Sequence, residues 1–109
     1  MKLNITKFPA EINPNFKGGD GVLITRMFSD EKNKILYATL PPKSSVGEHR
    51  HETSSEIIYI LSGTSTCICD GERESLAPGV CHYCPMGSTH TIINNSTEDL
   101  VFIAVVPEH

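Results

Sequence analysis

Four side chains of this 109-residue chain have the types and spacing of metal ligands. His49 and His51 are two residues apart, and on an extended strand such residues point to the same face, so both imidazoles could reach one ion. Glu56 opens the next strand-like run, and His90 follows a Pro-x-Gly turn that could direct it to the same place. Each feature alone is also compatible with an ordinary core or surface residue. Together they make one metal site the leading hypothesis.

Three imidazoles and one carboxylate form a donor set that suits a divalent transition metal, namely Fe, Mn, Ni, Co, Zn or Cu. Four protein ligands leave two positions open on a six-coordinate ion. Closed structural sites lack such openings, whereas sites that bind a substrate or O₂ have them. The expected cofactor is therefore one transition metal that binds a small molecule.

The elements that must position these residues are predicted to be short β-strands. Runs of β-favouring residues alternate with turn residues, and Asp70-Gly71 is a strong hairpin signal. No long 3.6-residue periodicity is present, so an all-β antiparallel sandwich or barrel is expected. We predict a single domain over residues 22–109, preceded by an arm or edge strand over residues 1–21. The predicted strands cover residues 22–27, 35–40, 46–51, 56–61, 64–69, 72–76, 80–84, 91–94 and 100–106.

Two spaced motifs contain the candidate ligands. The first is Lys43-x5-His49-x-His51-x4-Glu56-x6-Gly63, and the second is Gly79-x5-Pro85-x-Gly87-x2-His90-x3-Asn94. They resemble the two motifs of the cupin superfamily, Gly-x5-His-x-His-x3/4-Glu-x6-Gly and Gly-x5-Pro-x-Gly-x2-His-x3-Asn. The one departure is Lys43, which stands where the family usually has a turn glycine. It therefore concerns the shape of a loop and leaves the candidate ligands unchanged.

The resemblance covers most of the chain and is to the small, single-domain cupins. It implies a double-stranded β-helix, a jelly-roll barrel, with a metal bound inside by His49, His51, Glu56 and His90. Cupins include dioxygenases, isomerases, epimerases, lyases and decarboxylases, and also proteins that only bind a ligand. The expected function is a metal-dependent enzyme acting on a small oxygen-rich molecule, with a non-catalytic binding or sensor module as the alternative. Fold resemblance does not name the reaction.

Other polar side chains are weaker candidates. Tyr37, Tyr59 and Arg26 lie on predicted strands and could contact a substrate, although packing or solvent exposure is the commoner role for each. His82 and His109 fall outside both motifs. We assign His82 to the other face of its strand and His109 to a frayed terminus.

The four cysteines have a spacing that could suggest a structural zinc site. They are Cys67, Cys69, Cys81 and Cys84. A Cys-x-Cys pair lacks the knuckle spacing of zinc sites, and cysteine on a strand commonly acts as a small buried hydrophobe. We favour that second interpretation.

Composition excludes several classes of partner. The net charge of −4 gives no basic field for nucleic acid, and no apolar run approaches the ~20 residues of a membrane span. The first residues lack the pattern of a cleaved signal, so a cytoplasmic location is expected. Four apolar side chains of the N-terminal arm have no obvious place in a minimal barrel, so we expect a homodimer paired through this arm. They are Ile5, Phe8, Ile12 and Phe16.

Overall fold

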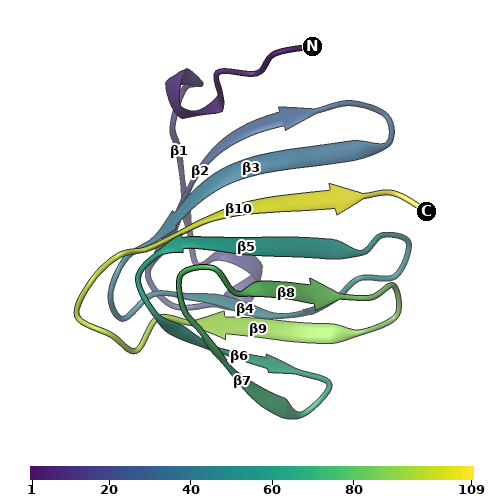
Figure 1. Ribbon diagram of the computed structural model, residues 1–109. Helices are drawn as coiled ribbons and strands as arrows, with labels where there is room; N and C mark the ends of the chain where they lie inside the picture. The colour runs from purple at the N-terminus through teal and green to yellow at the C-terminus, as the bar shows by residue number, and fades with distance from the viewer.

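The structure, a computed structural model that describes residues 1–109, contains ten strands in two facing antiparallel sheets (Figure 1). The larger sheet has the order β1-β2-β3-β10-β5-β8, and the smaller has the order β4-β9-β6-β7. This is the all-β jelly-roll barrel expected from the sequence. The strands are β1 (Glu11–Pro14), β2 (Val22–Ser29), β3 (Asn33–Leu40), β4 (Ser45–Arg50), β5 (Glu56–Ser62), β6 (Ser65–Cys69), β7 (Glu72–Leu76), β8 (Cys81–Cys84), β9 (Thr89–Ile93) and β10 (Leu100–Pro107).

The helical content is limited to two 3-10 turns, η1 (Ile5–Lys7) and η2 (Phe16–Gly18). No helix of the chain has the length and apolar character that crossing a membrane requires. Each predicted strand is present, with small shifts at its ends. The strand prediction succeeds because the turns between these strands carry Gly, Pro, Asn and Asp, which favour chain reversal.

The core lies between the sheets and follows the alternation of side chains along each strand. On β5, Ile58 and Ile60 are 1% and 0% exposed, whereas Tyr59 between them is 46% exposed. On β9, Ile92 is 2% exposed and faces the same interior. The sequence predicted this phase for both strands, because Glu56 and His90 were expected to point inward.

The N-terminal segment packs against its own chain. β1 pairs with β2, and η1 contacts β2 and β3, which leaves Leu3, Ile5 and Phe8 partly buried. Phe16 in η2 packs against the core. Ile5, Phe8 and Phe16 are thus partly buried against their own chain, unlike what the sequence suggested, because η1 and η2 fold back onto the sheets. Ile12 on β1 remains 66% exposed.

Asn94 ties together two loops at one end of the barrel. Its side chain is fully buried and donates hydrogen bonds to the carbonyls of Leu40 and Glu98, each at 2.8 Å. Its backbone carbonyl accepts from the amide of Lys43 at 3.0 Å. Because each of these bonds satisfies a main-chain group, the asparagine of the second motif stabilises the loops and does not contact the candidate ligands.

Lys43 adopts the left-handed backbone conformation that usually requires glycine, with φ of 64°. We expect Lys43→Gly to stabilise the protein by about 0.5–1 kcal/mol, because relief of left-handed strain exceeds the added chain entropy of the unfolded state. Urea denaturation measures the change. Lys32→Gly is the control, since Lys32 is an exposed turn residue without positive φ, and it should lower stability. A Lys43→Gly variant that is less stable than the parent would contradict this account.

Candidate metal centre

The candidate ligands come from two strands of the smaller sheet, one strand of the larger sheet and one loop. His49 lies on β4 opposite His90 on β9, His51 follows the end of β4, and Glu56 begins β5. The β4–β9 register shifts between Val46 and His49, which marks a β-bulge. Val46 is buried and faces inward. Because β4 has one extra residue at the bulge, His49, three residues later, also faces inward. The bulge therefore directs His49 and His51 to the interior.

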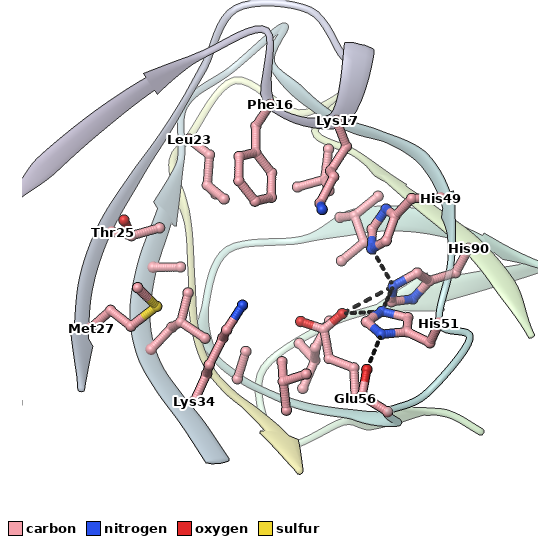
Figure 2. A pocket seen from close by; sticks show the side chains of 18 of the residues that line it. Phe16, Lys17, Leu23, Thr25, Met27, Lys34, His49, His51, Glu56 and His90 are labelled. Atoms are coloured by element: carbon pink, nitrogen blue, oxygen red, sulfur yellow. Dashed lines mark hydrogen bonds and ion pairs between the residues drawn. The ribbon is translucent and has the colours of Figure 1, made fainter. Parts of the chain in front are cut away.

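The four side chains converge on one point, and their ligand atoms all lie within 4.8 Å of one another. His90 Nε2 lies 3.0 Å from Glu56 Oε1, 3.1 Å from His51 Nε2 and 3.3 Å from His49 Nε2. His51 Nε2 lies 3.1 Å from the same Glu56 oxygen. Figure 2 shows the three rings and the carboxylate directed toward one another at the wall of a cavity. These separations suit neighbouring ligands of one ion, since two atoms roughly 2.1 Å from a metal at right angles lie roughly 3 Å apart.

Hydrogen bonds at the far side of two rings orient them for this purpose. His49 Nδ1 lies 2.8 Å from the Gly47 carbonyl, which only accepts, so Nδ1 carries the proton and the neutral ring leaves Nε2 with a lone pair. His51 Nδ1 lies 3.1 Å from the Ser54 hydroxyl, which can donate or accept.

His82 lies in the interior beside the site, so its assignment to the other face of the strand is wrong. It is 2% exposed, and β8 pairs it with buried Ile58 of β5, which places both on one face. His82 Nε2 is 3.0 Å from His90 Nδ1, and His82 Nδ1 is 2.8 Å from the Glu74 carboxylate. The sequence Cys81-His82-Tyr83-Cys84 has no dominant apolar face, so its pattern gave no signal of this orientation.

The electrostatics favour an ionised carboxylate at the centre of the site. Burial would raise the pKa of Glu56, but its contacts with His51 and His90 outweigh that effect and hold it at about 2. Burial lowers the pKa of His49, which favours its neutral form. Three ring nitrogens and one negative charge thus converge within 4.8 Å, an arrangement that a bound cation stabilises once it displaces the protons shared with Glu56. The donor set fits a divalent transition metal.

The site opens into a cavity of about 610 Å³ between the sheets. Eleven of its 25 lining residues are hydrophobic, Leu23, Ile58 and Phe102 among them. Two lysines that the sequence analysis did not single out, Lys17 and Lys34, also line it. Figure 2 shows both side chains reaching into the cavity toward the side that holds the candidate ligands. Both residues are exposed.

The lysines could not be found from sequence because neither belongs to a motif. Lys34, Leu36 and Ala38 are two residues apart and share the inner face of β3. This spacing was a weak indication in the sequence that Lys34 faces inward. Lys17 lies in η2, whose position depends on how the N-terminal segment folds back.

The three weak catalytic candidates lie away from the cavity. Tyr37, Tyr59 and Arg26 are absent from its lining. Tyr59 is 46% exposed on the outer face of β5, and Tyr37 lies opposite Ile103 on the same outer face. Arg26 donates a hydrogen bond to the Phe8 carbonyl and so fixes η1 to β2. Their positions fit packing and surface roles.

The cysteines and the terminal histidine have structural surroundings. Cys67 and Cys84 are fully buried, and burial raises the pKa of each thiol to about 12, as expected of small hydrophobes. All four cysteines are free, and no cluster of potential ligands contains two of them. His109 is not frayed as expected: its amide donates to the Thr53 carbonyl at 2.8 Å, and its Nε2 lies 2.9 Å from Ser55 Oγ.

Comparison with known proteins decides the family. Residues 36–106 match the family described as Cupin domain. The chain belongs to the cupin family. This cupin is 38% identical over 107 residues to an oxalate-binding protein of Thermotoga maritima, covering 89% of this chain and 88% of that one.

Solved structures agree on the fold of this cupin. The crystal structure of a predicted oxalate decarboxylase from Thermotoga maritima is similar with a TM-score of 0.93, 30% identity and complete coverage of both chains. A putative sugar phosphate isomerase from Acidithiobacillus ferrooxidans has a TM-score of 0.83 at 22% identity, covering all of this cupin and 75% of that chain. The latter likeness shows the fold alone.

Proposed function

We propose that this cupin binds one divalent transition metal through His49, His51, Glu56 and His90, and binds a small oxygen-rich acid at that metal. The observation that carries the proposal is the convergence of four ligand atoms within 4.8 Å at the wall of a cavity. A six-coordinate ion would have two positions open toward that cavity. A bidentate ligand such as a hydroxy acid or a dicarboxylate matches two adjacent positions.

Lys17 and Lys34 support an anionic ligand. Both ammonium groups reach into the cavity toward the candidate ligands (Figure 2). A carboxylate bound at the metal would lie in the cavity between the sheets, where a nearby cation stabilises it more strongly than in bulk water. The oxalate-binding relative agrees with this ligand class, and oxalate is therefore the first acid to test.

Turnover of the bound acid is the leading candidate activity, and binding without turnover is the second. The metal, when bound, would supply Lewis acidity at the ligand oxygens, or O₂ activation if it is Fe, Ni or Cu. The chain itself would balance the acid's charge with the lysines. Binding without turnover is supported by the residues of the cavity wall. The catalytic candidates from the sequence are absent from it, and the two lysines could serve binding alone.

One experiment separates these functions. The metal-loaded protein is titrated with oxalate, malonate and lactate by calorimetry, and each mixture is then analysed for consumed acid, CO₂ and formate. Loss of an acid with stoichiometric products supports the enzyme. Saturable binding with the acid recovered unchanged supports the binding module. Absence of binding for every acid, in protein that holds its metal, would contradict the proposed ligand class.

Replacing Lys17 and Lys34 together tests whether they bind the carboxylate of the acid. We expect Lys17→Ala with Lys34→Ala to weaken oxalate binding by about 10-fold or more, since charged hydrogen-bond partners contribute about 1.5–3 kcal/mol each before solvent screening. The metal content should not change. Lys7→Ala with Lys32→Ala removes the same charge from exposed positions outside the cavity and is the control. Equal weakening in both pairs would show a general charge effect and contradict a specific site.

We also propose that two copies pair through the outer face of the larger sheet. On β5, Ile57, Tyr59 and Leu61 are 37%, 46% and 42% exposed, and Tyr83 on β8 is 54% exposed. Ile57 lies opposite Tyr83, and Tyr59 lies opposite Ile103 of β10, so the apolar surface is continuous across three strands. None of these positions is charged, so this contact would not bring like charges directly against each other.

Light scattering tests this pairing. The protein is expected to have a dimeric mass at tens of micromolar, and Tyr59→Glu is expected to give a monomer, because a two-fold interface buries the new charge twice. Ile12→Glu is the control for pairing through the N-terminal edge strand and should leave the dimer intact. A monomeric parent protein, or loss of the dimer only in Ile12→Glu, would contradict pairing through the outer face.

A further inference from the structure

We propose that Glu74 and His82 are positioning residues that bias the tautomer of His90 toward the form whose Nε2 faces the metal position without a proton. The inference rests on the proposed metal site and extends it beyond the four ligands. The three residues come from β7, β8 and β9, and they form a line of contacts from the surface to the site.

The donor and the acceptor of each hydrogen bond can be assigned by starting from Glu74 at the surface. The ionised Glu74 carboxylate only accepts, so the 2.8 Å contact with His82 Nδ1 places a proton on that nitrogen. In a neutral His82, Nε2 then has only a lone pair. His90 Nδ1 lies 3.0 Å away and supplies the proton between them. On the other side of the ring, Glu56 Oε1 lies 3.0 Å from His90 Nε2 and competes for a proton there until an ion binds. Glu74 and His82 therefore bias His90 toward the form whose Nε2 is free to bind the ion.

Burial makes this arrangement effective. His82 and His90 are 2% and 1% exposed, so water does not compete for their ring nitrogens. The Glu74 side chain is 44% exposed and can change without opening the core. The Gly47 carbonyl performs the same task for His49, whereas the Ser54 hydroxyl leaves the direction open for His51. Glu74 is thus the surface group that orients a buried ligand from a distance.

A second metal position is the competing explanation. Cys67 Sγ lies 3.5 Å from His82 Nε2, and Cys67, His82 and His90 together could hold an ion. The hydrogen bonds that run from Glu74 through His82 to His90 are called the relay here. The relay is favoured because it gives both nitrogens of His82 and the Nδ1 of His90 a partner without any ion. A second ion would also have to occupy a fully buried position, since Cys67 is 0% exposed.

Nitrogen NMR of the imidazole rings tests the tautomer in metal-free protein. Because Glu56 also faces His90 Nε2 in this state, both tautomers are expected in the parent protein, and Glu74→Ala is expected to shift the population toward the Nε2-protonated form. Glu72→Ala is the matched control, since it removes the same charge from the same strand but has no contact with His82. A parent protein without His90 protonated at Nδ1, or a tautomer population unchanged in Glu74→Ala, would overturn the proposal.

A cobalt titration followed by visible absorption tests the consequence. Glu74→Ala is expected to weaken Co²⁺ binding about 10- to 100-fold, as loss of a partner behind a metal-bound histidine typically does. Glu74→Gln keeps an acceptor oxygen and should recover part of the affinity, and Glu72→Ala should match the parent. Unchanged affinity in Glu74→Ala would refute the relay.

The remaining outcomes separate the relay from the proposed function. A parent protein that binds no metal refutes the metal site, and the NMR result on the metal-free protein still decides the tautomer. Two Co²⁺ ions per chain, one of them lost in Cys67→Ala, would replace the relay with the second metal position.

Discussion

Adding metal to the metal-free protein is expected to raise its unfolding temperature by roughly 10–20 °C when the free ion is at about one hundred times its dissociation constant. An ion that binds only the folded chain contributes about 2.7 kcal/mol at that concentration. In a domain of this size, each kcal/mol shifts the midpoint by roughly 4–8 °C. The ligands reach the site from β4, the following loop, β5 and β9, so the unfolded chain does not present them together. Calorimetric scans with Mn²⁺, Co²⁺ and Zn²⁺ measure the shift.

The double variant His49→Ala with His51→Ala is expected to lose this response and to contain no stoichiometric metal by elemental analysis. Half of the donor set is then missing, and the remaining carboxylate and single ring are poor competitors with water. Glu48→Ala is the control, because Glu48 lies on the same strand, is exposed and does not line the cavity. A double variant that keeps its metal and its full thermal shift would place the ion elsewhere.

The sequence predicted the strands and the set of candidate ligands because both depend on local pattern. On β5, alternation from Glu56 through Ile58 to Ile60 gives the inward face directly, and the burial of both isoleucines agrees. The spacing of His49 and His51 gives their common face in the same way. These properties need no knowledge of distant parts of the chain.

The parts that sequence missed depend on contacts between distant strands. His82 faces inward because β8 pairs with β5 in a register that places it opposite Ile58, and its own neighbours do not reveal that register. Lys17 reaches the cavity only because η2 folds back onto β4. The bulge after Val46 is equally hidden, since two histidines two residues apart share a face whether or not a bulge precedes them.

Gly47 joins the fold to the site, and Gly47→Ala is expected to destabilise the protein by about 3 kcal/mol or more. A methyl group at this position would meet the Lys17 carbonyl carbon at 2.6 Å and the Gly19 amide nitrogen at 2.7 Å. Both are backbone atoms, which cannot move aside as a flexible side chain does, so η2 must separate from β4. Urea denaturation measures the loss.

Gly71→Ala is the control, because it adds the same methyl group in a hairpin with nothing within 4 Å, at a positive φ of 82°. It should cost only about 1–2 kcal/mol from left-handed strain. Gly47→Ala should also weaken metal binding, since the Gly47 carbonyl is the acceptor that orients His49, whereas Gly71→Ala should leave it unchanged. Displacement of η2 would move Lys17 as well, so affinity for the acid should fall along with affinity for the metal. If Gly47→Ala loses stability but keeps both affinities, the packing of η2 on β4 does not position the site.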